Sequence, residues 1–94
     1  MAYELENKFV QICLNEGNYF FTSHFNIRRS ERKISEDEIL NVIINGNYES
    51  AEDSKFGLPR MKYVYNNITV IIEINITDGI LFITCYKDEK NKEI

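Results

Sequence analysis

Cysteine, histidine and long hydrophobic runs are all scarce in this sequence. The two cysteines, Cys13 and Cys85, lie among apolar residues and lack the spacing of metal ligands. We therefore expect buried, reduced thiols in a reducing cytoplasm, without a disulfide or a metal centre. No apolar run approaches the roughly 20 residues that span a bilayer, and the N-terminus lacks the basic and apolar regions of a signal peptide. A membrane location is therefore not expected.

Positive charge is also in the minority. Eleven lysines and arginines stand against 15 acidic residues, which gives a formal net charge of −4 at pH 7. Because general nucleic-acid binders are usually basic, this balance disfavours such a protein. The basic residues are nevertheless clustered, since Arg28, Arg29, Arg32 and Lys33 fall within six positions. This segment is where we expect any cationic site.

The length of 94 residues predicts one domain, residues 1–94, with its core between helices and one sheet. Apolar residues make up 44% of the chain and aromatic residues 13%, which is enough to fold without a metal or a disulfide. We expect an N-terminal helix within residues 1–17 and a solvated, charged tail over residues 88–94.

Helical spacing begins close to the N-terminus. Apolar residues recur at the helical period from Leu5 to Cys13, and Gly17 is a suitable C-terminal stop. This pattern predicts a helix over residues 3–15. The short aromatic segment 18–21 that follows is either an extended linker or a strand.

Two further helices have strong start signals. Thr22 or Ser23 can cap a helix that runs to about Lys33. The segment 35–38 is a capping box that opens a third helix, and Gly46 ends it. The second helix is poor in apolar residues, so much of its surface is expected to face solvent or a ligand.

The C-terminal half predicts strands. The expected strands span residues 48–52, 60–65, 68–76 and 80–86. The dipeptides Asn66-Asn67 and Asp78-Gly79 are typical of two-residue hairpin turns. The resulting fold class is α+β, with N-terminal helices packed on one face of a three- to four-stranded antiparallel β-meander.

Two-residue turns also predict the register of this sheet. The expected pairs are Arg60 with Glu73 and Met61 with Ile72 around the first turn, and Ile76 with Leu81, Asn75 with Phe82, Ile74 with Ile83, Glu73 with Thr84, Ile72 with Cys85 and Ile71 with Tyr86 around the second. One face is then apolar and lies against the helices. The other carries a row of Arg60, Glu73 and Thr84, beside a second row of Lys62, Ile71 and Tyr86.

The polar row has two interpretations. An arginine, a carboxylate and a hydroxyl aligned across three strands can form a ligand-binding surface. Alternatively, Arg60 and Glu73 are a cross-strand ion pair on a half-solvated sheet.

The most informative stretch of the chain is the second predicted helix. His24, Arg28 and Arg32 follow each other at intervals of four, so on a helix they project along one stripe. One imidazole backed by two guanidinium groups can hold a phosphate and move a proton near neutral pH. A site that combines this stripe with the polar row requires the second helix to sit at the edge or end of the sheet.

This segment resembles the bacterial family called Domain of Unknown Function 4258, whose members share a pattern close to T-x-H-x-x-x-R-x-x-E-R-x-I-S and a closing T-x-Y strand. The residues that carry the resemblance are Thr22, His24, Arg28, Glu31, Arg32, Ile34, Ser35, Ile39, Gly46, Pro59, Arg60, Thr84 and Tyr86. The likeness covers the helices and sheet of residues 18–87 and leaves the first helix outside. Lys33 departs from the family, which commonly has glycine there. The family resembles small ribonuclease toxins of toxin–antitoxin systems.

The resemblance implies a metal-independent ribonuclease of the bacterial cytoplasm, in which the 2′-hydroxyl of the RNA is the nucleophile. Such an enzyme needs a base, an acid for the leaving 5′-oxygen and cations on the phosphate. His24 is the candidate base, Arg28 and Arg32 the phosphate clamp, and Thr84 or Tyr86 the group that orients the substrate or donates a proton. The substrate-binding candidates are Arg60, Lys62 and Glu73. RNA and a cognate antitoxin are the implied partners, with no cofactor and no metal ligand.

Other interpretations remain open from the sequence. The acidic surface and an exposed Tyr86 and Phe82 also suit a non-enzymatic protein-interaction or inhibitor module. DNA binding by a helix-turn-helix is disfavoured, because the acidic segment 36–38 at the start of the third helix repels phosphate. His24 can instead pack or cap structurally, and the two arginines of the stripe can be a solvated face partly paired with Glu31.

Overall fold

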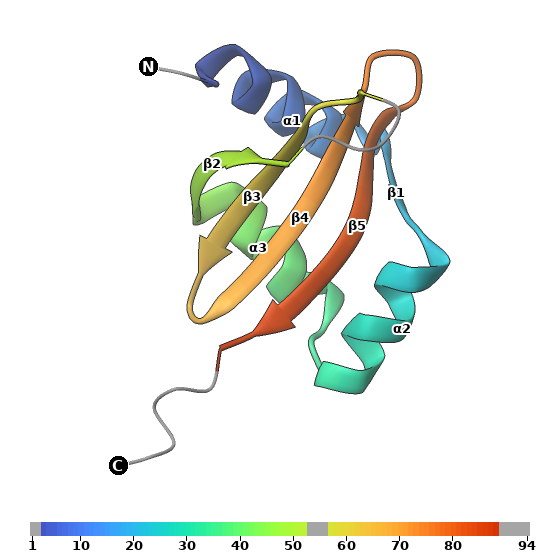
Figure 1. The fold of residues 1–94 in the computed structure, drawn as a ribbon, viewed down its shortest axis with the longest axis vertical. Helices are drawn as coiled ribbons and strands as arrows, with labels where there is room; N and C mark the ends of the chain where they lie inside the picture. The colour runs from blue at the N-terminus through green and yellow to red at the C-terminus, as the bar shows by residue number, and fades with distance from the viewer. Residues whose placement is uncertain (1–2, 53–56, 89–94) are drawn as a thin grey trace.

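The computed structural model describes residues 3–52 and 57–88. Its elements are α1 (Glu4–Glu16), β1 (Tyr19–Phe21), α2 (Ser23–Arg32), α3 (Glu36–Asn45), β2 (Asn47–Ala51), β3 (Arg60–Tyr65), β4 (Ile68–Asn75) and β5 (Gly79–Lys87). The α+β class is confirmed (Figure 1). The predicted tail lies outside the described residues apart from Asp88, whose N–H donates to the carbonyl oxygen of Asn67 at 2.6 Å.

The ends of the helices follow the predicted capping residues. Gly17 closes α1 in the left-handed conformation, with φ of 79°. Thr22 caps α2, because its Oγ1 accepts a hydrogen bond from the N–H of Phe25 at 3.1 Å. Ser35 and Glu38 form the complete capping box of α3. These three capping predictions are confirmed. They could be made from the sequence because each capping residue bonds the backbone within one helical turn.

Lys33 ends α2 in a conformation that normally favours glycine. Its φ is 58° and its backbone N–H bonds the last carbonyls of the helix. Lys33 therefore adopts a left-handed conformation that costs a residue with a Cβ some backbone strain.

The sheet has the strand order β1-β5-β4-β3-β2. Strands β2 to β5 pair antiparallel, as the predicted meander requires, whereas β1 adds parallel to β5 and makes the sheet mixed. Segment 18–21 is therefore a strand rather than a linker. Two backbone bonds bracket this pairing: Ile80 donates to Asn18 at 3.1 Å and Thr22 donates to Phe82 at 3.3 Å.

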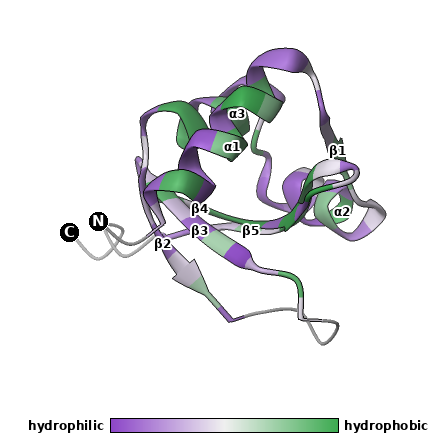
Figure 2. Cartoon of the chain, turned by 90° about the horizontal axis from the view of Figure 1, so that it is seen from above, coloured by the Kyte–Doolittle hydropathy of each residue, from purple (hydrophilic) through white to green (hydrophobic). Residues whose placement is uncertain are grey.

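The sequence predicts helices on one face of a three- to four-stranded sheet, but the sheet of the described residues has five strands and only two of the three helices cover that face. α1 and α3 cover one face of the sheet, while α2 lies at the sheet edge beside β5 (Figures 1 and 2). Strand β1 pairs only with the first part of β5, from Ile80 to Phe82. The remaining edge of β5 is therefore free of strand partners, and α2 packs there with the buried Phe25 against Phe82.

One hydrophobic core fills the space between the sheet and the helices. Its buried residues include Val10, Cys13, Phe25, Ile34, Ile39, Val42, Ile43, Met61, Tyr63, Val70, Ile72, Ile80, Phe82 and Cys85. Both thiols are free and buried, as expected. The hydroxyl of Tyr63 is satisfied within this core, because it donates to Oδ1 of Asn7 at 2.6 Å.

The turn between β3 and β4 confirms its prediction. Asn66 and Asn67 have φ of 53° and 68°, the two left-handed residues of a type I′ hairpin turn. Arg60 accordingly pairs with Glu73, and Met61 with Ile72.

The predicted register between β4 and β5 is wrong. The structure pairs Asn75 with Gly79, Glu73 with Leu81 and Ile72 with Phe82, so the loop spans residues 76–78. The Asn75 Oδ1 accepts hydrogen bonds from the N–H groups of Thr77 at 2.9 Å and Asp78 at 3.2 Å, which closes the turn earlier than the dipeptide predicts.

A β-bulge then shifts the second half of β5. Ile71 pairs with Thr84 although its neighbour Ile72 pairs with Phe82, which leaves Ile83 as the extra residue. The bulge returns Cys85 to the buried face, opposite Val70. Without it, the strand alternation would turn the Cys85 thiol towards the other face.

Several side chains consequently change face. Phe82 is fully buried instead of exposed, because its ring packs 4.8 Å from Phe21 and 5.2 Å from Phe25 between centroids. Leu81 and Ile83, expected in the core, are only half-buried, and Ile76 is exposed in the turn. The aromatic cluster around Phe82 therefore outweighs the local turn signal.

Candidate functional site

The inner side of α2 is held by Phe25 and Arg29. Phe25 is completely buried, and the Arg29 guanidinium lies 5.7 Å from the centre of the Phe21 ring. Arg29 also donates hydrogen bonds of 3.3 Å to the carbonyl oxygen of Ile34 and to Oδ1 of Asn26. Arg29 therefore contacts β1, and the packing of Phe25 against Phe82 attaches α2 to β5.

The predicted stripe of His24, Arg28 and Arg32 lies on this anchored helix. His24 is exposed, and its imidazole makes no hydrogen bond to any described residue. Arg28 is partly exposed, and its Nη1 lies 3.3 Å from Oε1 of Glu31 in a solvent-accessible ion pair. Arg32 is exposed and forms no ion pair within residues 3–52 and 57–88. The His24 imidazole and the Arg32 guanidinium are therefore accessible to solvent. The Arg28 guanidinium has only the weak, exposed ion pair with Glu31.

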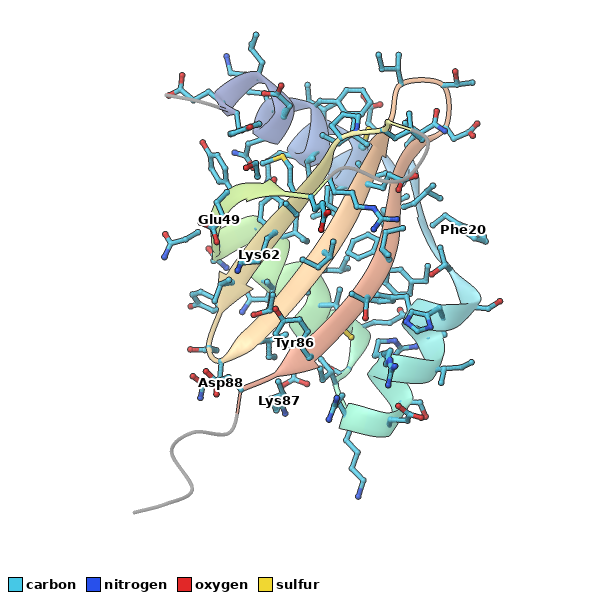
Figure 3. All side chains as sticks on the ribbon, in the orientation of Figure 1. Phe20, Glu49, Lys62, Tyr86, Lys87 and Asp88 are labelled. Carbon is cyan, nitrogen blue, oxygen red and sulfur yellow. The ribbon has the colours of Figure 1, made fainter. Side chains whose placement is uncertain are left out.

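Thr84 and Tyr86 lie on β5, the strand on which α2 packs. Both belong to the open face, which we define as the sheet face turned away from α1 and α3, because they pair with Ile71 and Thr69. Thr84 is half-buried. Tyr86 is exposed (Figure 3). The requirement that the second helix sit at the sheet edge is thus met, so the stripe and this pair occur on adjacent elements.

The predicted polar row is broken by the register of β5. Arg60 and Glu73 align with Leu81, whereas Thr84 stands in the next row with Ile71 and Lys62. Tyr86 moves one row further, opposite Thr69, so the second predicted row is wrong in the same way. The structure therefore does not bring Thr84 into line with Arg60 and Glu73.

The cations of the open face already have partners. Arg60 Nε lies 2.9 Å from Oε1 of Glu73, whose side chain is only 9% exposed. Lys62 Nζ lies 3.2 Å from Oε2 of Glu49 (Figure 3). The first contact is the cross-strand ion pair that was the alternative interpretation of this row.

Sequence reasoning missed Phe20. It pairs with Leu81, is 61% exposed and lies between Tyr19 and Phe21, which both pack against the core (Figure 3). The strand alternation of Tyr19-Phe20-Phe21 was the available signal, since only every second ring of a strand can face the core. Phe20 and Tyr86 are therefore two exposed aromatic rings on the open face. Phe20 is level with Leu81 of β5, so along the direction of β5 Thr84 lies between the two rings.

The thiols are poor nucleophiles. Burial raises the pKa of the Cys85 thiol, and the positive charges of Arg29 and Arg32 offset only part of this increase. Burial also raises the pKa of the Cys13 thiol, with a further contribution from Glu16. Both groups therefore stay protonated at neutral pH, and neither suits nucleophilic catalysis.

No helix in the described part of the chain is long and apolar enough to cross a membrane. Residues 3–52 and 57–88 contain no group of three or more side chains able to hold a metal ion.

Comparison of the chain with protein-family models found no match, and comparisons with curated proteins and with solved structures found no significant match. The resemblance to Domain of Unknown Function 4258 therefore stays a prediction that rests on its motif residues.

Proposed function

We propose that this protein is a metal-independent ribonuclease that acts on single-stranded RNA through the RNA 2′-hydroxyl, in the manner of a bacterial toxin. One observation carries the proposal: α2 is anchored at the free edge of β5 and presents an accessible His24 beside two arginines, next to the strand that bears Thr84 and Tyr86. An imidazole, guanidinium groups and a phenol are the groups that phosphoryl transfer without a metal requires.

In the proposed reaction His24 accepts the proton of the 2′-hydroxyl. The oxygen of that group attacks the adjacent phosphorus, and the bond from phosphorus to the 5′-oxygen breaks as the new bond forms. Arg28 and Arg32 hold the non-bridging oxygens of the phosphate. The leaving 5′-oxygen takes a proton from the phenol of Tyr86, while Thr84 orients the substrate. The products are a 2′,3′-cyclic phosphate and a 5′-hydroxyl end.

The exposed rings favour single-stranded over duplex RNA. Unstacked bases bind proteins by stacking on aromatic side chains, and Phe20 and Tyr86 offer two such surfaces on the open face. Since Arg60 and Lys62 are ion-paired, few cations remain for phosphate, and RNA binding is expected to be modest and sensitive to salt. Because an uncontrolled ribonuclease would degrade the RNA of its own cell, we also expect a cognate antitoxin protein in the same cytoplasm that inhibits it.

The test incubates the purified protein with single-stranded RNA in excess EDTA. The protein should cleave the RNA and leave cyclic phosphate ends, and a 2′-deoxy substitution at the cleaved position should block the reaction. We expect His24→Ala to slow cleavage on the order of 100-fold or more, as is typical for loss of a general base. Arg32→Ala should slow it on the order of 100-fold through loss of charge stabilisation.

Lys8→Ala is the matched control, because Lys8 is an exposed cation on α1, away from the proposed site. It should cleave RNA at the wild-type rate. Wild type and both site variants cleaving alike, with folding verified by circular dichroism, would refute the proposal and leave the interaction-module interpretation.

A further inference from the structure

A second surface of the molecule lies away from α2. An apolar groove of about 490 Å³ runs between the start of α1 and the loop that joins β4 to β5. Its apolar lining comprises Leu5, Phe9, Leu58, Pro59, Ile74 and Ile76. Leu5 is 78% and Ile76 is 88% exposed, so two large aliphatic side chains of this groove are accessible to solvent. We call this feature the α1 groove.

The α1 groove continues into a smaller cavity of about 220 Å³ that shares Phe9 and Ile76 with it. Ile12, which lines this cavity, is 55% exposed. Leu5, Phe9 and Ile12 are spaced at i, i+4 and i+7 and form one stripe along α1, whereas the buried Val10 and Cys13 face the core. Phe9 also packs in part against the core, whereas Leu5 and Ile12 are exposed and are not needed to attach α1 to the sheet.

The charge around this surface has one sign. Among the described residues that line the two cavities, the charged ones are Glu6, Glu16 and Asp78, and all are acidic. Lys8 is on α1 but lines neither cavity. A second copy of this chain would bring the same carboxylates against each other across a two-fold axis, which is unfavourable.

From this combination we propose that the α1 groove binds a basic amphipathic helix of another protein. An apolar stripe of about two helical turns, extended by Ile76, fits the apolar face of one helix in the groove mode of peptide recognition. Lysines or arginines flanking that face would meet Glu6, Glu16 and Asp78. The surface includes no residue of α2, so the inference is independent of RNA cleavage.

The experiment titrates the 94-residue chain into a fluorescently labelled synthetic helix of leucine and lysine, about 18 residues long so that it is stably helical. Anisotropy should show saturable binding of this peptide and none of a matched leucine–glutamate peptide. Ile76→Ser should weaken binding roughly tenfold, the loss typical of a buried aliphatic anchor. The double variant Glu6→Gln and Glu16→Gln should weaken it and reduce its dependence on salt.

Ile44→Ser is the matched control, since Ile44 is an exposed isoleucine on α3 that lines neither cavity. It should bind like the wild type. Absence of binding, equal binding of the acidic peptide, or a larger loss with Ile44→Ser than with Ile76→Ser would overturn the inference. Sedimentation that finds a wild-type dimer and a monomeric Ile76→Ser variant would instead identify a second copy as the occupant. RNA cleavage by Ile76→Ser should equal that of the wild type, so the two proposals fail separately.

Discussion

Two cross-strand ion pairs on the open face, Arg60–Glu73 and Lys62–Glu49, differ in how much they contribute to the stability of the fold. Among the described residues Glu73 is the one charged residue that is buried, and Arg60 supplies its counter-charge from the neighbouring strand. An ionised carboxylate in such a position is stable only while it is paired. Lys62 and Glu49 form a second cross-strand pair, but both are much more accessible. The two pairs therefore differ in burial and allow a direct comparison.

Arg60→Met should lower the free energy of unfolding by about 2–3 kcal/mol, because it leaves the Glu73 carboxylate without its partner. Lys62→Met, which breaks the accessible pair, should cost less than about 1 kcal/mol. Urea unfolding followed by circular dichroism measures both values. A double variant Arg60→Met and Glu73→Leu should regain much of the lost stability, since the buried charge is removed as well. Equal costs for the two single variants would contradict this account.

At the scale of elements, β5 organises the candidate site. It has β4 along one edge, β1 along the first part of the other edge and α2 along the rest. The bulge at Ile83 turns Cys85 into the core and leaves Thr84 and Tyr86 on the open face. The start of β5 is equally constrained, because Gly79 has φ of 101° and a Cβ there would lie 2.1 Å from the carbonyl oxygen of Asn18.

Gly79→Ala should therefore be severe. The left-handed φ and the collision with the Asn18 backbone act together, and we expect a loss of about 3 kcal/mol or more in the free energy of unfolding. Gly17→Ala is the matched control, since Gly17 has φ of 79° but no atom within 4 Å of the added Cβ. It should cost only the left-handed strain of about 1–2 kcal/mol. Thermal unfolding of both variants tests the difference, and similar losses would show that the contact with Asn18 is unimportant.

At the scale of the whole molecule, the core formed by the described residues holds the thiols of Cys13 and Cys85 and the phenol of Tyr63, whose pKa values are all raised. Burial raises the pKa of the Cys13 and Cys85 thiols above the ordinary value of 9.0, and burial together with Tyr48 raises the pKa of the Tyr63 phenol above the ordinary 10.0. In the unfolded chain these groups lose their protons at the lower, ordinary values. The folded state therefore binds more protons than the unfolded state above about pH 9.

The stability from these groups is fully present below pH 9 and is lost as the pH rises towards their higher folded values. We expect the free energy of unfolding to decline between pH 9 and 11. Urea titrations at each pH provide the measurement. Tyr63→Phe should lower stability at pH 7, because the bond to Asn7 is lost, but should make the alkaline decline shallower. An unchanged slope in that variant would exclude Tyr63 as a contributor.

The helix ends and the first hairpin could be predicted from the sequence because their signals are local. Gly17, Thr22 and the capping box of Ser35 each bond within one turn, and Asn66-Asn67 sets its own backbone dihedrals. The pairing of Arg60 with Glu73 follows directly from that turn. Likewise, once the ends of α2 are predicted, helical periodicity places His24, Arg28 and Arg32 in one stripe.

Other features were decided only by tertiary packing. The aromatic cluster of Tyr19, Phe21, Phe25 and Phe82 buries Phe82 and so selects the β4–β5 register against the turn that Asp78-Gly79 predicts. That contact spans about 60 residues of sequence, and no local pattern reports it.

The same cluster attaches β1 parallel to β5 and seats α2 at the sheet edge, which is what makes the stripe a neighbour of Thr84 and Tyr86. The amino-acid sequence alone therefore determined which residue types could form a site, because side-chain chemistry and helical period are local properties. Their arrangement depended on long-range burial of aromatic surface, whose free energy exceeds that of a single turn.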